Sequence, residues 1–533
     1  YPDLQGGLAL LFEQASSRGH VQDTDYGKIT FPFTIRNQFT STFATIKASV
    51  ENKGYLRKYQ QEFFKSSLTK KAKSGFSGYE FQEKYDQNRK KAFIKQLLTH
   101  KIKVYKDGDT YTVPLKQPQH RMVQTMFETY DKYRDSVFYD ASAWSVANFY
   151  NIKYKGVKSI KLGSEVTTVK GIIENVKIKK SEYAYILNWD DYNAPAALYY
   201  MQSKGLLVSA AFKPFTINTT SGEINFNFGS LLIPVSKQNK TSAAVHQIVL
   251  EAQEKFKVPV FGTNSGYSIK GIDLGSNNFR VLKKPKVAML IGEGVNSYEA
   301  GEVWHLLDTR VHLPITKIRI NNYNRANLDN YNTIVMVSGN YSQLDSLKRL
   351  KLKNWTAKGN TLITIAGGSK WLIDKKMVKE SLTKDASLKV KKEEKEKKII
   401  KRLPYVEASE HIGRERLGGA IFEVDLDVTH PLGFGYRSSK LPVYKNNLVF
   451  LSPSKNPYAT VAKYSENPHV DGYISKNNLE KFIKPSASIV VSGIGKGRVI
   501  LFADNPNFRG AWYGTNKLFL NAIFLGGKIN MPK

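Results

Sequence analysis

The sequence predicts an α/β protein, and three observations support this fold class. Short apolar runs typical of buried strands alternate with helical stretches over residues 286–365, the order of a doubly wound α/β domain. Two strand–helix–strand units precede them, at 185–208 and 231–261. Apolar residues make up 41% of the chain and aromatic residues 12%, which suffices for sizeable cores and excludes a wholly disordered chain.

The chain of 533 residues has room for about three or four domains. Composition and periodicity divide it into three segments: residues 1–74, a mixed α/β middle region at 75–285, and a doubly wound domain at 286–533.

The first segment opens with an apolar run, residues 7–12, which predicts a buried central strand ending on Glu13. A polar turn follows at 14–20. An apolar stripe with steps of 4, 4, 3 and 4 then predicts an amphipathic helix that continues past Gly54 to the basic stretch 70–73; its members are Ile35, Phe39, Phe43, Ile46 and Val50.

The middle region contains a hairpin pattern, with strands at 101–105 and 110–113 around a Gly-containing turn. Alternating strands and helices then favour a parallel or mixed sheet. The expected strands are 185–187, 206–208, 231–233 and 258–261, and the expected helices are 196–203 and 243–256.

The third segment continues the alternation. Its expected strands are 287–291, 333–337, 361–365, 421–427, 489–492 and 498–502, the last two pairing across a Gly-rich turn. Its expected helices are 297–308, 343–358 and a closing helix at 516–524.

The net charge of +34 does not by itself indicate a nucleic-acid partner, because the lysines are spread along the whole chain and no nucleic-acid-binding motif accompanies them. The densest run, 389–402, is interleaved with glutamates and is typical of a solvated helix or loop. The absence of cysteine excludes disulfides, cysteine zinc sites and cysteine nucleophiles. No apolar stretch approaches the roughly 18–20 residues of a membrane-spanning helix.

Glu13 is the most informative residue for chemistry. A carboxylate at the end of a buried strand is partly desolvated, which would raise its pKa towards the range of a general base. A helix cap or an ion-pair partner of Arg18 is an equally good interpretation of the spacing alone.

Residues 10–19 (LLFEQASSRG), followed by 29–33 (ITFPF) and a long helix, resemble the end of a zinc carboxypeptidase domain of the carboxypeptidase A-like metallopeptidases. The resemblance implies that Glu13 is the general base that takes a proton from zinc-bound water during peptide-bond hydrolysis. It also implies zinc as the cofactor, a peptide or protein substrate with Arg18 as candidate substrate-binding residue, and a periplasmic or secreted location.

The sequence departs from that family in its metal ligands. The family needs His-x-x-Glu and a later His, yet none of the nine histidines has Glu three residues on. His411 precedes Glu415 by four positions, and His20 is expected to be an ordinary loop residue. We therefore assign no metal ligand. We expect the chain, which begins at Tyr1, to be the C-terminal part of a longer protease and to be inactive alone.

Residues 287–294, 335–339 and 363–368 resemble a class I glutamine amidotransferase-like domain. Active members carry a Cys at a sharp strand–helix turn, where Ala366 or a neighbouring Gly stands in this chain. Glutaminase chemistry is therefore excluded. Ser369 is expected to be a helix N-cap instead of a replacement nucleophile.

Three further features are weaker candidates. His430 is expected to be a hydrogen-bonded loop histidine, with a remnant of an active site as the alternative. Residues 504–513 form a polar–aromatic loop that would suit a carbohydrate or peptide surface, although such turns commonly pack on their own domain. The motif at 292–294 lacks the third glycine of a dinucleotide-binding fingerprint.

The preferred interpretation is the C-terminal part of a bacterial zinc metallocarboxypeptidase with a catalytically silent amidotransferase-like domain. The alternative is a non-enzymatic ligand- or carbohydrate-binding protein with a vestigial peptidase end. A nucleic-acid binder using the +34 charge is the third, and it predicts steeply salt-dependent binding to DNA.

Overall fold

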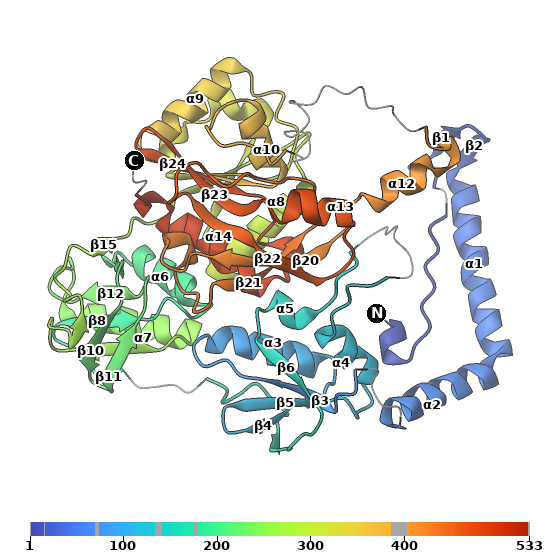
Figure 1. Ribbon diagram of the computed structural model, residues 1–533, viewed down its shortest axis with the longest axis horizontal. Helices are drawn as coiled ribbons and strands as arrows, with labels where there is room; N and C mark the ends of the chain where they lie inside the picture. The colour runs from blue at the N-terminus through green and yellow to red at the C-terminus, as the bar shows by residue number, and fades with distance from the viewer. Residues whose placement is uncertain are drawn as a thin grey trace. The chain divides into compact units, whose positions relative to one another are not determined.

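The computed structural model describes residues 2–14, 16–69, 74–133, 141–173, 178–384 and 402–530. The chain forms two compact units (Figure 1). The first comprises Tyr1–Phe81, Lys95–Met126 and Tyr154–Thr168, and the second comprises Gln82–Ile94, Phe127–Lys153 and Val169–Lys533. The basic stretch 70–73 and nearly all of the charged run 389–402 lie outside the described residues. No helix in the described ranges is long and apolar enough to cross a membrane.

The first unit begins with a hairpin and two helices. Thr30 caps the first helix by accepting a hydrogen bond from the backbone amide of Phe33, and Pro32 fits the first turn because an N–H there would have no helical partner. The predicted helix is thus confirmed, with a break at Asn52. The elements are β1 (Val21–Thr24), β2 (Gly27–Thr30), α1 (Phe31–Glu51) and α2 (Lys53–Thr69).

The strand predicted at residues 7–12 is wrong. This segment has no regular secondary structure, and its apolar side chains are exposed, Leu11 at 83%. A strand needs a neighbour for its backbone N–H and C=O groups, and none pairs with this segment within the described ranges. The apolar run therefore lacks the sheet that the sequence pattern anticipated.

The first unit also contains a five-stranded antiparallel sheet in the order β6-β3-β5-β4-β7. The predicted hairpin is confirmed as β4 and β5, with Gly108 at a positive φ of 57° in the turn. The strands are β3 (Gly78–Phe81), β4 (Tyr105–Asp107), β5 (Thr110–Pro114), β6 (Tyr154–Val157) and β7 (Ser164–Glu165). Helices α3 (Gln87–Thr99) and α4 (His120–Phe127) adjoin these strands in the sequence.

In the second unit, the predicted strand–helix–strand units are present, but their sheet is antiparallel throughout, in the order β13-β8-β12-β9-β15. In each strand–helix–strand segment, the helix returns the chain to a strand of the same direction, but a strand of the other segment lies between the two. β12 lies between β8 and β9, and β8 lies between β12 and β13. The expectation of a parallel or mixed sheet is therefore wrong. The elements are β8 (Ala184–Leu187), α6 (Ala194–Ser203), β9 (Ser209–Ala211), β12 (Leu231–Pro234), α7 (Ser242–Phe256), β13 (Val260–Thr263) and β15 (Phe279–Val281).

A small three-stranded sheet adjoins it in the chain, in the order β11-β10-β14. Its strands are antiparallel. They are β10 (Phe215–Thr219), β11 (Gly222–Phe226) and β14 (Lys270–Gly271).

A nine-stranded sheet forms the rest of the second unit, in the order β17-β16-β18-β19-β24-β23-β22-β20-β21. The first five strands are parallel, with β17 and β18 on opposite sides of β16, which confirms the doubly wound pattern. The remaining strands pair antiparallel. The strands are β16 (Val287–Ile291), β17 (Ile315–Arg319), β18 (Thr333–Met336), β19 (Thr361–Ile365), β20 (Ala420–Leu426), β21 (Lys440–Lys445), β22 (Thr460–Asp471), β23 (Ala487–Ile494) and β24 (Gly497–Phe502).

The helices of this part confirm the predicted ones within a few residues. Helix α14 is buried along almost its whole length, from Gly514 to Leu525, which explains why its sequence is apolar on every side. The helices are α5 (Val146–Phe149), α8 (Ser297–His305), α9 (Ser346–Ala357), α10 (Gly367–Asp374), α12 (Ala408–Arg414), α13 (Lys476–Asn478) and α14 (Tyr513–Leu525).

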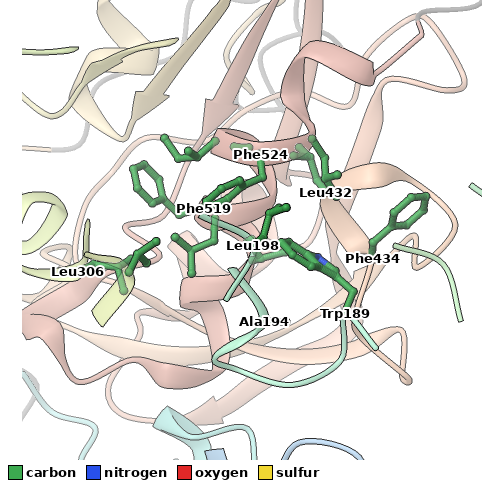
Figure 2. Close-up of a cluster of buried hydrophobic side chains, with 14 of the residues drawn as sticks. Trp189, Ala194, Leu198, Leu306, Leu432, Phe434, Phe519 and Phe524 are labelled. Atoms are coloured by element: carbon green, nitrogen blue, oxygen red, sulfur yellow. The ribbon is translucent and has the colours of Figure 1, made fainter. Parts of the chain in front are cut away.

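One continuous core joins the antiparallel sheet to the nine-stranded sheet. Figure 2 shows the side chains of α14 beside those of α6 and of the loop that follows β8. Trp189 lies edge-on to Phe524, with ring centroids 6.1 Å apart. Both faces of α14 are thus covered, and the residues on either side of position 285 belong to one hydrophobic core.

Candidate functional site

The structure places Glu13 and Arg18 on the surface of the first unit. Both residues are exposed, and no salt bridge joins them within the described ranges. Arg18 has a positive φ of 48°, and its backbone amide donates to Ser16 Oγ at 3.2 Å. The structure therefore does not bring the two candidates together into a site.

An uncovered apolar face runs along α1. None of its residues is buried, and the apolar side chains repeat at helical spacing on one side, with Phe39 exposed at 63% and Val50 at 70%. The predicted stripe is thus confirmed, but nothing covers it in the described structure. The predicted members Ile35, Phe39, Phe43, Ile46 and Val50 are all exposed, and Phe31 at the start of the helix is exposed too. A cavity of about 590 Å³ lies between residues 6–10 and the junction of α1 with α2, and none of the stripe residues lines it.

The described residues do not offer a metal site. Within these ranges, no group of three or more His, Cys, Asp or Glu side chains could hold a metal ion. The described residues therefore do not fit a zinc ion.

The carboxyl ends of the parallel strands carry the turn expected of an amidotransferase-like domain. Ala366 lies between β19 and α10 with φ 45° and ψ −109°, a strained conformation for a residue other than glycine. Ala366 itself thus occupies the sharp turn. Ser369 is not the N-cap: it lies inside α10, fully buried, donates to the carbonyl of Phe502 at 2.8 Å and shares a hydrogen bond with Thr364.

The crevice where such folds bind ligands lies between β16 and β18, on either side of which the connections diverge. Here the two loops pair directly: the amide of Asn296 donates to the carbonyl of Ser338 at 2.9 Å, and that of Asn340 to the carbonyl of Gly294 at 2.8 Å. A Cβ on Gly339 would lie 2.9 Å from Cα of Val295. Close backbone approach thus accounts for the glycines here without a phosphate ligand.

The polar–aromatic loop at 504–513 is mostly engaged within its own domain. Asp504 accepts hydrogen bonds from Tyr464 and Ser488 and pairs with the buried Lys445 at 3.1 Å. Asn505 and the amide of Arg509 donate to the carboxylate of Glu302. Burial raises the pKa of Glu302 to about 7.

His430 is a hydrogen-bonded loop histidine, as expected. Its Nδ1 accepts from the amide of Leu432 at 3.1 Å at the start of a short helical turn. Burial lowers the pKa of His430 to about 4, so the ring is neutral at physiological pH.

A charged cavity of about 260 Å³ lies within the second unit, and sequence analysis did not anticipate it, although Tyr513 of the loop at 504–513 lines it. Half of its lining residues are charged, with both signs present. The segments that line it are 82–89, 151–153, Asp190, 435–438 and 513–517.

One wall of the cavity is the turn that precedes α3. Arg89 pairs with Glu83 at 2.6 Å and with Asp86 at 3.1 Å, and Asp86 also accepts from the amide of Arg89, which caps the helix. Burial raises the pKa of Asp86, and the positive charge of Arg89 opposes that rise. The positive charge of Arg89 is therefore balanced within this turn by the carboxylates of Glu83 and Asp86.

Asp190, in the loop that follows β8, and Lys517 of α14 also line the cavity. Lys517, which is buried, donates to the backbone carbonyls of Trp189, Asp190 and Asp191 at 2.5, 2.7 and 2.8 Å. Burial lowers the pKa of Lys517, and nearby carboxylates oppose this. Burial and the charge of Asp86 raise the pKa of Asp191 to about 7.

Asp190 also lines the cavity, where it pairs with Arg437. Arg437 donates from Nε and Nη2 to the same carboxylate oxygen, Oδ2, at 2.7 and 2.6 Å. The other oxygen, Oδ1, is buried and has no hydrogen-bond partner among the described residues. Two adjacent carboxylates, Asp190 and Asp191, in the loop that follows a buried strand were the sequence signal that could have pointed to this cavity.

These features define an α/β protein with a doubly wound sheet and a charged cavity. No protein-family model matches the sequence, and no curated protein matches it. Among solved structures, a ThuA-like protein from Bacteroides uniformis is 13% identical, with a TM-score of 0.25, over 44% of this chain and 89% of that one. A ThuA-like protein from Parabacteroides merdae is 12% identical, with a TM-score of 0.29, over 47% and 93%.

A glutamine amidotransferase from Thermotoga maritima is 12% identical, with a TM-score of 0.26, over 45% of this chain and 81% of that one. It is a protein of the kind that the sequence resemblance named for the third segment. None of these structures is a zinc carboxypeptidase. Because their TM-scores lie below 0.5, they carry no inference about what this chain does.

Proposed function

We propose that the chain is the C-terminal part of a zinc-dependent metallocarboxypeptidase that hydrolyses peptide bonds. Residues 1–74 would complete the peptidase domain, and the second unit would be an accessory, catalytically silent domain. Peptide or protein would be the substrate, and the location would be periplasmic or extracellular. The proposal rests on the sequence resemblance around Glu13 and on one structural observation.

That observation is the uncovered apolar face of α1. Most helix stability in proteins comes from packing an apolar face, yet none of the 21 residues of α1 is buried. Large apolar side chains aligned on one side of a helix are typical of a surface that another part of a fold covers. A peptidase sheet supplied by other residues would cover this face and give residues 7–12 neighbouring strands.

Zinc enters this proposal only through residues other than those described, because the described residues offer no metal site. Within this chain, Glu13 would act as a general base and Arg18 would contact the substrate. Their exposure in the described structure is compatible with such roles, since a neighbouring domain would enclose both.

The test is peptide hydrolysis by the product of the complete gene, comparing wild type with Glu13→Gln. We expect release of C-terminal amino acids to fall by about 10²- to 10⁴-fold, the usual contribution of a general base. Zinc content per chain should stay unchanged, since Glu13 would not be a ligand. A matched control is Glu62→Gln, whose side chain is exposed and pairs with Lys65 at 3.9 Å.

Full activity of Glu13→Gln would remove Glu13 from the mechanism. Absence of hydrolysis in the wild type would overturn the proposal altogether. Loss of zinc on substitution of Glu13 would make it a ligand or a structural support instead of a base.

A second candidate function is ligand binding without catalysis. The charged cavity of the second unit favours it, because it combines Tyr513 of the polar–aromatic loop with buried charged side chains. Saturable binding of a small ligand by a chain with no peptidase activity would support this alternative.

A further inference from the structure

In the charged cavity, one carboxylate oxygen of Asp190 has no hydrogen-bond partner among the described residues. Arg437 and Asp190 do not form the usual parallel fork, in which each N–H donates to its own carboxylate oxygen. Both donors meet Oδ2, at 2.7 and 2.6 Å, so that Oδ1 has no hydrogen-bond partner among the described residues. A buried acceptor without a partner is costly, and a ligand or water that donates to it would relieve that cost.

Asp190 is well placed to serve a ligand. Its residue exposure is 3%, and it lines the cavity directly. The terminal torsion of an aspartate is soft, so a partial rotation of the Asp190 carboxylate can turn the buried Oδ1 towards the cavity at small cost. The carboxylate can therefore hold Arg437 with one oxygen and accept from a ligand with the other.

The cavity also has a cationic side. Arg437 is partly exposed, with its guanidinium 4.2 Å from the ring centroid of Tyr85, and its Nη1 is not used by Asp190. Lys153 is exposed at the same cavity. A ligand carboxylate in this cavity could thus meet two cations, Arg437 and Lys153.

We propose that this cavity binds a free α-amino acid. The ammonium group would donate to Asp190, and the carboxylate would meet Arg437 and Lys153. Charges of both signs at one small cavity suit a zwitterion better than a neutral sugar or a simple anion, because an anion would face the unpaired oxygen of Asp190. A volume of about 260 Å³ limits the ligand to the size of a single residue.

This inference deepens the proposed function, and its biological meaning depends on that function. A carboxypeptidase releases free amino acids, so the accessory domain would bind the product of the same chain. Binding itself does not depend on hydrolysis, and the two proposals can therefore fail separately.

The test is isothermal titration calorimetry on the 533-residue chain. The probes are alanine, leucine, phenylalanine, lysine and glutamate in their free L forms. Each is compared with its α-amide, which lacks the carboxylate, and with its desamino acid, which lacks the ammonium; glucose is the neutral sugar probe. We expect a Kd of about 1 mM or tighter for at least one amino acid, and at least about tenfold weaker binding of its two analogues.

Two variants locate the site. Arg437→Gln should weaken amino-acid binding by at least about tenfold. Asp190→Asn should weaken binding of the amino acid but not of its desamino analogue, an asymmetry that general damage to the fold would not produce. The matched control is Asp329→Asn, which breaks an exposed pair with Lys358 at 2.9 Å and should leave binding unchanged.

Several outcomes would overturn the proposal. They are the failure of all five amino acids to bind at about 10 mM, glucose binding as tightly as the best amino acid, and undiminished binding in both Arg437→Gln and Asp190→Asn. Glu13→Gln should bind the amino acid normally, so an inactive peptidase with intact binding would separate this inference from the proposed function.

Discussion

Trp189 donates a hydrogen bond of 2.7 Å from its indole Nε1 to Oδ1 of Asn521, across 332 positions of the chain. The amide nitrogen of Asn521 donates in turn to the carbonyls of Leu432 and Phe434, each at 2.8 Å. One fully buried side-chain amide therefore ties the loop after β8, the turn at 432–434 and α14 together inside an apolar core.

We expect Asn521→Leu to destabilise the second unit strongly. The substitution leaves one indole N–H and two carbonyls without partners in the core, and each unsatisfied group costs about 1–3 kcal/mol. The free energy of unfolding should fall by about 3 kcal/mol or more, measured by urea denaturation followed by circular dichroism. Asn477→Leu, at an exposed asparagine, is the control and should change it by less than about 1 kcal/mol. Equal effects of the two variants would show that the buried amide is not important.

The strained turn at Ala366 gives a second prediction. A non-glycine residue at φ 45° and ψ −109° costs about 1–3 kcal/mol, and glycine adopts this conformation with little strain. Ala366→Gly should therefore be neutral or stabilising by up to about 1 kcal/mol, despite the loss of a buried methyl group. Ala357→Gly, at the end of α9, should lower the free energy of unfolding by about 1 kcal/mol, because glycine is less favourable than alanine in a helix. If the melting temperature falls in both variants, backbone strain at Ala366 does not destabilise the protein as predicted.

The strands of the third segment could be predicted because central strands of a parallel sheet are buried on both faces and appear as continuous apolar runs. β22 was missed because it is long, polar in places and irregular in register where it pairs with β20 and β23. The order of the antiparallel sheet could not be predicted, since inserting β12 between β8 and β9 leaves no local pattern in either strand.

The candidate sites were harder to predict than the fold. The resemblance to an amidotransferase-like domain placed the sharp turn at Ala366 or a neighbouring Gly, and the structure shows that Ala366 occupies it. The charged cavity draws on five separated segments, and of its lining residues Tyr513 lies in the loop that the sequence marked as a candidate binding surface. Contacts such as Arg437 with Asp190 join positions 247 residues apart, and no sequence spacing indicates them.

The apolar face of α1 gives a third prediction, with opposite outcomes in two samples. In the 533-residue chain, the double substitution Phe39→Ser and Phe43→Ser should change thermal stability little, because both rings are exposed at about 60%. It should reduce self-association in analytical ultracentrifugation, since it removes part of an exposed apolar patch.

In the product of the complete gene, the same double substitution should be destabilising by several kcal/mol if a peptidase sheet covers the face, as loss of two buried aromatic side chains would be. Lys47→Ser and Glu51→Ser, which break an exposed pair on the same helix, provide the control. Equal stability of both double variants in the product of the complete gene would mean that the face is not covered there.

The pKa of Asp191 predicts how stability depends on pH. Burial, reinforced by the charge of Asp86, raises the folded-state pKa from 3.8 to about 7. Between these values the folded carboxyl holds a proton that the unfolded chain has released, so stability should fall as pH rises from about 4 to 7. The slope from this one group is at most about 1.4 kcal/mol per pH unit. In Asp191→Asn, whose amide does not titrate, urea denaturation at pH 5 and pH 7 should show a smaller loss of stability than in wild type. An unchanged pH dependence in Asp191→Asn would mean that Asp191 is already ionised at pH 5 in the folded protein.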